Sequence, residues 1–216
     1  TRLGIIPKGS GNGLANELGI PRNPAKACAA LFASRPMSID VGKMNDQYFF
    51  NIAGIGLDAQ VAALFNDPSR KQRGIFPYVY LSLREVLRFK PIDVEIGMER
   101  QNFQMKALVV AVANCKQYGA GARIAPLAKV DDGYLHVTAI NPVNLFKLAL
   151  NVPRLFNGTL HQVPEVLTLK TKSLILKTEK PIIYHLDGDT FKPAKVFNFT
   201  TLPGALKILV PQNSKI

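Results

Sequence analysis

Apolar and polar positions change their spacing along the chain, and this change divides the sequence into two parts. In the first 90 residues, the spacing typical of amphipathic helices recurs at 12–19, 23–34, 57–66 and 74–89. Ser10 or Asn12 is available as N-cap of the first of these helices, and Gly19 as its C-cap. Residues 38–56 alternate instead, like two strands joined by a turn at Asn45 and Asp46. This order predicts an α/β opening.

Beyond Lys90 the sequence is rich in β-branched and aromatic residues that alternate between apolar and polar, with turn residues between the alternating runs. These runs cover residues 91–115, 134–140, 166–186 and 195–202. One stretch with helical spacing, residues 141–158, interrupts them. The second part therefore predicts a β-sandwich with an inserted helix, and the whole chain an α+β fold.

Composition narrows the class of protein. With 216 residues, 47% of them hydrophobic, the chain can bury about 70% of the surface that it would expose when unfolded. No apolar run approaches the roughly 20 residues that cross a bilayer, and the first residues lack the zones of a signal peptide. Cys28 and Cys115 lie far apart without metal-ligand spacing, which indicates reduced thiols and a cytoplasmic setting.

The formal net charge of +12 is large for this length. A positive field of that size attracts nucleic acids, anionic lipids or phosphorylated ligands without choosing among them. The Lys and Arg residues are scattered, so an ordinary solvated surface remains an alternative. Since the sequence shows no basic cluster with interleaved aromatic residues, we expect no nucleic-acid partner.

The stretch GIIPKGSGNGLANELGIP, residues 4–21, predicts a strand, a glycine-rich turn and a helix start. Backbone N–H groups at such a turn favour an anion, and Ser10 and Lys8 could add a hydroxyl and a charge. The glycine spacing matches neither the Walker pattern nor the dinucleotide fingerprint. An ordinary tight turn therefore remains open.

Two acidic stretches are the other candidates. In HLDGDTF, Asp187 and Asp189 flank a glycine between two expected strands. The two carboxylates could bind a hydroxyl group or a metal ion. Alternatively, the stretch only forms a hairpin turn. In APLAKVDDGYLHV, Asp131 and Asp132 could hold a divalent cation through oxygen ligands, or again only form a turn.

Taken in order, these stretches and FFNIAGIGLDAQV resemble the diacylglycerol kinase, sphingosine kinase and bacterial lipid kinase family over the whole chain. Members of that family carry a GGDGT-like nucleotide loop upstream, and no GDGT occurs here. The resemblance therefore implies the C-terminal portion of such a kinase, inactive by itself. It implies a remnant of the α/β nucleotide-binding domain at residues 1–36, a β-sandwich domain at 37–203, and a segment returning to the first domain at 204–216.

The resemblance also implies roles for individual residues. Ser10 would contact the phosphates of ATP, in a loop shaped by Gly9, Gly11 and Asn12. Asp187 would be the base that takes the proton of the lipid hydroxyl, with Asp189 in place of the usual Glu. Asp132, with the carbonyl groups of Lys129 and Tyr134, would match a structural Mg²⁺ site.

The expected function is phosphoryl transfer from ATP, with Mg²⁺, to a lipid alcohol such as diacylglycerol or a sphingoid base. The expected partners are the lipid substrate, an anionic membrane surface bound peripherally, and a second copy in a homodimer. A fragment that only binds lipid or assembles with other chains, and a soluble kinase similar to NAD kinase, are the alternatives.

Overall fold

The computed structural model describes the chain except residues 10, 68–74, 100 and 215–216, and it also leaves out the side chains of 75–79. The helices are α1 (Gly13–Glu17), α2 (Pro24–Phe32), α3 (Leu57–Asn66), α4 (Ile75–Val86), α5 (Leu145–Asn157) and the 3₁₀ helix η1 (Leu160–Gln162). The strands are β1 (Ser34–Met44), β2 (Gln47–Phe49), β3 (Ile52–Gly56), β4 (Ile92–Met98), β5 (Gln101–Ala107), β6 (Val109–Ala113), β7 (Leu135–Ile140), β8 (Val166–Thr171), β9 (Ser173–Leu186) and β10 (Asp189–Pro211).

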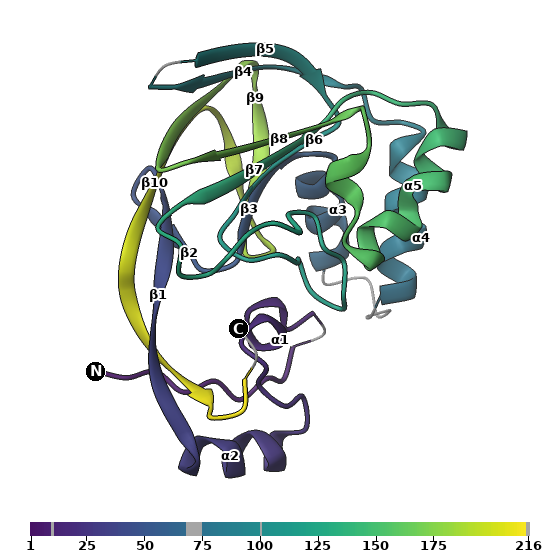
Figure 1. Cartoon of the computed structure of the whole chain (residues 1–216). Helices are drawn as coiled ribbons and strands as arrows, with labels where there is room; N and C mark the ends of the chain where they lie inside the picture. Colours follow the sequence, from purple (N-terminus) through teal and green to yellow (C-terminus); the bar gives the residue numbers. More distant parts are fainter. Residues whose placement is uncertain (10, 68–74, 100, 215–216) are drawn as a thin grey trace.

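All ten strands join one antiparallel sheet that curls over itself (Figure 1). The long strand β9 makes this possible, because its first half pairs with β4 and its last residues pair with β3 along the same edge. The main core lies inside the curl, where Phe49, Phe197 and Phe199 are buried together. The predicted β-sandwich and the mainly β composition of the second part are confirmed.

Helices α3, α4 and α5 lie together beside the sheet (Figure 1). Leu57 and Val61 of α3 and Leu81 of α4 pack on Val109 and Ala111 of β6, which forms a second apolar cluster. The helical spacing predicted for residues 57–66, 74–89 and 141–158 is confirmed by these three helices.

A third apolar cluster joins the beginning of the chain to its end. Leu18 and Ala27, from the region of α1 and α2, pack with Ile39 of β1 and with Ile208 and Val210 of β10. Leu3 donates its N–H to the carbonyl of Lys207, 2.9 Å away, and the N–H of Leu209 donates to the Leu3 carbonyl at 2.8 Å. The domain boundaries at 36 and 203 stay a prediction.

Two further expectations concern the surface and the thiols. Cys28 is exposed, Cys115 is buried, and both are free, as predicted. Within the described residues, we find no helix that combines the length and the apolar character needed to cross a membrane.

Candidate functional site

A cavity of about 720 Å³ lies between the sheet and the helices. Most of its wall is apolar and comes from α3, β6, α5 and the region of η1, with side chains such as Val61, Val109, Leu155 and Leu160. Its polar lining residues include His185, Asp187 and Asp189 at the β9–β10 turn, Asp58 of α3, and Gly9, Gly11 and Asn12 of the glycine-rich loop. The cavity therefore combines the apolar surface that binds hydrocarbon with a group of acidic and loop residues.

Asp187 is held by the backbone of a neighbouring turn. One carboxylate oxygen accepts the N–H groups of Asn51 and Ile52 at 2.8 and 3.0 Å, and the other accepts the N–H of Phe50 at 2.8 Å. Asp187 and Gly188 have positive φ angles of 52° and 99°, as expected for a two-residue hairpin turn. The turn interpretation of HLDGDTF is therefore confirmed, and the same turn places a carboxylate at the cavity.

The electrostatic environment of this carboxylate has two opposing parts. Although Asp187 is exposed as a residue at its turn, its carboxyl group faces the protein, and the loss of water there raises its pKa from the ordinary value. The three N–H groups act in the opposite direction on the pKa without cancelling the rise. A carboxylate whose pKa is raised accepts a proton more readily than an ordinary aspartate.

A second acidic group lies deeper in the wall. The buried Asp58 shares its Oδ2 atom between the hydroxyl of Tyr118, which donates at 2.8 Å, and the Nε2 atom of His185 at 3.2 Å. Gly54 faces His185 across β3 and β9, and a Cβ atom there would overlap both Asp58 and His185. The glycine thus makes room for the contact between carboxylate and imidazole.

Asn12 closes the glycine-rich loop on itself. Its side chain accepts the N–H of Gly9 at 3.0 Å and donates to the Gly9 carbonyl at 2.6 Å. Asn12 is the N-cap residue of α1, as predicted, with a left-handed φ of 51°, but its side chain makes no capping hydrogen bond. Ser10, the expected phosphate contact, lies outside the described residues.

The structure explains why a glycine follows Asn12. A Cβ atom on Gly13 would lie 2.4 Å from Asn51 Nδ2 and 2.6 Å from the Tyr118 carbonyl oxygen, closer than real Cβ contacts. The loop also binds the neighbouring segment, because Ala120 donates its N–H to the Gly11 carbonyl at 3.1 Å. Position 13 therefore fixes how closely the loop approaches the cavity wall.

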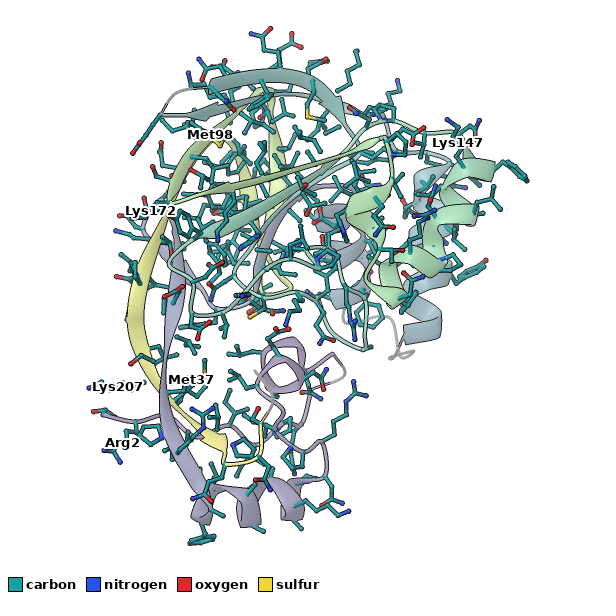
Figure 2. All side chains as sticks on the ribbon, in the orientation of Figure 1. Arg2, Met37, Met98, Lys147, Lys172 and Lys207 are labelled. Carbon is teal, nitrogen blue, oxygen red and sulfur yellow. The ribbon has the colours of Figure 1, made fainter. Side chains whose placement is uncertain are left out.

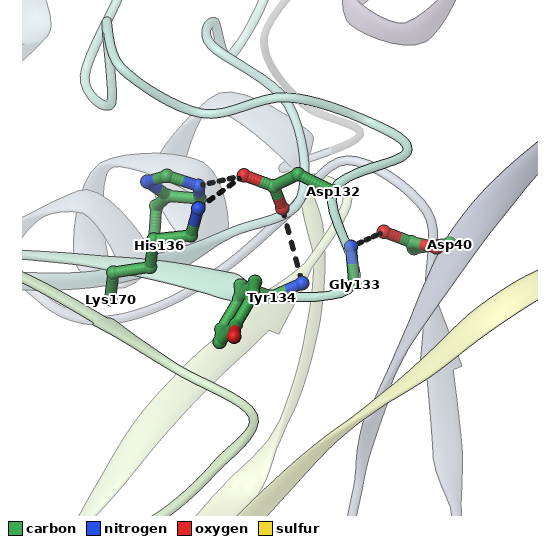
Figure 3. Close-up of polar contacts among 6 residues, drawn as sticks. All are labelled: Asp40, Asp132, Gly133, Tyr134, His136 and Lys170. Atoms are coloured by element: carbon green, nitrogen blue, oxygen red, sulfur yellow. Dashed lines mark hydrogen bonds and ion pairs between the residues drawn. The ribbon is translucent and has the colours of Figure 1, made fainter.

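Asp132 lies elsewhere and is already paired with cationic groups (Figure 3). Its Oδ2 atom is 3.0 Å from both Lys170 Nζ and His136 Nε2, and its Oδ1 accepts the N–H of Tyr134 at 3.1 Å. The adjacent Gly133 donates its N–H to Asp40. Together with the imidazole and the N–H group, the Lys170 ammonium outweighs the effect of burial and lowers the pKa of Asp132.

These contacts do not fit a Mg²⁺ ion on Asp132. Lys170 and His136 occupy Oδ2, so the cation would have to bind Oδ1, on the same carboxylate as the Lys170 ammonium, and the two positive charges would repel. Across the described residues, no group of three His, Cys, Asp or Glu side chains could hold a metal ion. The assignment of Asp132, Lys129 and Tyr134 as a metal site stays a prediction without support from the geometry.

The structure therefore brings some of the predicted site residues together and leaves others apart. The cavity described above is lined by Gly9, Gly11, Asn12, Asp187 and Asp189. It is not lined by Lys129, Asp132 or Tyr134. No role for Asp58, Tyr118 or His185 was predicted from the sequence. The signal for Asp58 was an acidic residue inside the mostly apolar run IAGIGLDAQV.

Comparison with known proteins supports this picture. Residues 51–210 match the YegS C-terminal NAD kinase beta sandwich-like domain, and residues 1–44 match the diacylglycerol kinase catalytic domain. A "Probable lipid kinase YegS-like" from Chromohalobacter salexigens is 28% identical over 220 residues, which cover 99% of this chain and 68% of that protein.

Two further comparisons agree. A diacylglycerol kinase of Mycobacterium tuberculosis is 29% identical over 221 residues, which cover 98% of this chain and 70% of that protein. A diacylglycerol kinase structure from Bacillus anthracis has the same fold, with a TM-score of 0.72 at 20% identity over 99% of this chain and 68% of its own. The chain therefore belongs to the family of the YegS C-terminal NAD kinase beta sandwich-like domain, whose relatives here include proteins named as diacylglycerol and lipid kinases.

Proposed function

We propose that this protein is an ATP-dependent kinase that phosphorylates the hydroxyl group of a lipid alcohol, such as diacylglycerol or a sphingoid base. One observation carries the proposal: an apolar cavity of about 720 Å³ shares its wall with a carboxylate, Asp187, and with the glycine-rich loop. An acceptor with a hydrocarbon chain and a hydroxyl group needs both kinds of surface. The kinase names of the relatives point in the same direction.

In this proposal, Asp187 accepts the proton of the lipid hydroxyl as the new O–P bond forms. The bond between the γ-phosphorus of ATP and its bridging oxygen breaks at the same time, and ADP leaves. An ionised carboxylate has about four lone-pair positions, and three N–H groups occupy three of them, so one remains for the hydroxyl. The fixed backbone donors also hold the carboxylate in a single orientation, which favours a reactive geometry. Asp189, which is exposed on the next strand, adds negative charge beside the same turn.

We propose that the phosphates of ATP are bound by Gly9, Ser10, Gly11 and Asn12. ATP bound there would supply the phosphoryl group, and Mg²⁺ bound with it would neutralise the charge that develops during transfer. The hydrogen bonds between Asn12 and Gly9 join these two loop residues beside the cavity. Since phosphoryl transfer depends mainly on positioning and charge, a glycine-rich loop beside the Asp187 carboxylate is the contribution expected of the chain.

The complete protein, incubated with ATP labelled on its γ-phosphate and a panel of lipid alcohols, is expected to transfer label to at least one lipid hydroxyl. The panel contains diacylglycerol, monoacylglycerol, a sphingoid base and, as a water-soluble control, NAD. Labelling of NAD instead of lipid would favour the soluble kinase. Tight lipid binding without any transfer would leave only a lipid-binding module.

A further inference from the structure

Helix α5 carries apolar side chains on two opposite faces. Leu148, Val152 and Leu155 line the cavity, while Phe146 and Leu150 point away from it and are 74% and 61% exposed. No residue of α5 is buried. The apolar residues of α5 cover more of its circumference than the part that faces the cavity, so a portion of its apolar surface lies exposed beside the polar face of Lys147, Asn151 and Arg154.

Helix α4 and the residue after it show the same arrangement. Tyr80, Leu83 and Leu87 follow one another at helical spacing and are 69%, 39% and 65% exposed. Ser82, Leu83 and Val86 line the cavity beside α5. We call the large exposed apolar residues of α5, of α4 and of the residue after α4 the α4–α5 surface: Tyr80, Leu83, Leu87, Leu145, Phe146, Leu150 and Phe156.

The α4–α5 surface is continuous with the cavity. Leu83 and Phe156 are exposed and also line the cavity wall. A hydrocarbon chain could therefore move from the outer surface into the cavity along apolar side chains. Such a route avoids the cost of passing the chain through water, about 0.8 kcal/mol per CH₂ group.

The net charge around this surface is positive. Arg84 pairs with Glu85 and Lys147 with Glu165, and Arg88, Lys90 and Arg154 supply the excess. Residues 75–90 and 141–158 contain five cationic side chains, namely Arg84, Arg88, Lys90, Lys147 and Arg154, and one acidic side chain, Glu85. Glu85 is buried and bound by Arg84 and Gln60, so it presents little negative charge to the outside. Figure 2 shows Lys147 near the beginning of α5 on the outside of the molecule, where Glu165 pairs with it.

We propose that the α4–α5 surface docks the protein on an anionic lipid bilayer and that the acceptor enters the cavity directly from the membrane. Exposed Phe, Leu and Tyr side chains enter the interface, while the surrounding Lys and Arg side chains meet anionic headgroups, each contributing about 1 kcal/mol. The inference rests on the proposed function for the identity of the acceptor. Its binding step can be measured without any catalysis.

The test measures binding of the complete protein to phosphatidylcholine vesicles with and without phosphatidylglycerol, by co-sedimentation. The double variant Phe146→Ser/Leu150→Ser is expected to raise the apparent dissociation constant for anionic vesicles about tenfold or more. The matched control is Phe32→Ser, which removes a 95% exposed phenylalanine from α2, away from this surface. Phe146 and Leu150 do not line the cavity, so phosphorylation of a soluble short-chain acceptor should stay unchanged in the double variant.

Three results would overturn the inference. The double variant could bind vesicles as well as the unchanged protein, or Phe32→Ser could weaken binding equally. Sedimentation equilibrium could also show a dimer that the double variant dissociates, which would assign the surface to a second copy of the chain. Failure of the proposed function looks different: vesicle binding would follow the expected pattern while no lipid alcohol is phosphorylated.

Discussion

Replacing Asp187 with asparagine is expected to slow phosphoryl transfer to the lipid alcohol by about a hundredfold or more, because the general base is lost. The same change should lower the free energy of unfolding by about 1–3 kcal/mol. An amide keeps one oxygen for the N–H groups of Asn51 and Ile52, but its NH₂ group faces the N–H of Phe50, so two donors meet. Asparagine tolerates the positive φ of this position, so the turn itself should persist.

The effects on catalysis and on folding can be separated. Turnover is measured at a temperature at which a denaturation curve shows Asp187→Asn to be folded, and Asp46→Asn, in another turn, serves as the control because its side chain is fully exposed. Turnover that falls only as far as the folded fraction falls would mean that Asp187 acts solely as a turn residue. Unchanged turnover would exclude it as the base.

The pH dependence gives an independent check on the same residue. A base works when it is ionised, and the pKa of Asp187 is raised, so activity should decline with falling pH already above the ordinary range of an aspartate. The raised pKa means that the folded protein favours the protonated carboxyl group, so this residue adds less to stability as pH rises through its folded pKa. The acid limb should be absent from any residual activity of Asp187→Asn.

Ala62→Phe is expected to reduce kcat/KM for a long-chain lipid alcohol by about tenfold or more. Ala62 lines the cavity from α3, and a phenyl group there would displace part of the bound hydrocarbon chain. Losing the burial of two or three CH₂ groups costs about 2 kcal/mol, which corresponds to more than a tenfold loss. A short-chain soluble acceptor, which does not fill the cavity, should be phosphorylated at nearly the original rate.

The neighbouring residue provides the control. Ala63→Phe adds the same side chain to the same helix at a half-buried position that does not line the cavity. Thermal unfolding of both variants reports any general damage to α3. Equal losses for long and short acceptors in Ala62→Phe, or equal losses in Ala63→Phe, would show that the cavity does not hold the hydrocarbon chain.

Local patterns predicted the elements of this fold well. The turn at Asn45 and Asp46 lies between β1 and β2 as expected, because Asn45 adopts the left-handed conformation that such a turn needs. The spacing of residues 57–66 predicted α3 to the residue. Local patterns could not predict the curl of the sheet. The curl depends on the pairing of β9 with β3 and β4, which joins residues far apart in the sequence.

The candidate site was predicted only where one stretch contains the chemistry. Asp187 was found because HLDGDTF places two carboxylates around a glycine and resembles a turn of the kinase family, but its three N–H donors come from residues 50–52. The contact of Asp58 with Tyr118 and His185 joins three separate segments of the chain. A local sequence pattern therefore cannot predict it. Asp132 resembled a metal ligand by its local sequence, whereas Lys170, which pairs with it, comes from β8.

The central claim is that the cavity holds the hydrocarbon chain of the acceptor while its hydroxyl group lies at Asp187. Photo-cross-linking tests this most directly, with a lipid alcohol that carries a diazirine at the end of its chain. After irradiation, mass spectrometry of the complete protein should locate the cross-links on the apolar wall formed by α3, β6 and α5, and Ala62→Phe should reduce them. Cross-links confined to residues outside this wall, or unaffected by Ala62→Phe, would contradict the account.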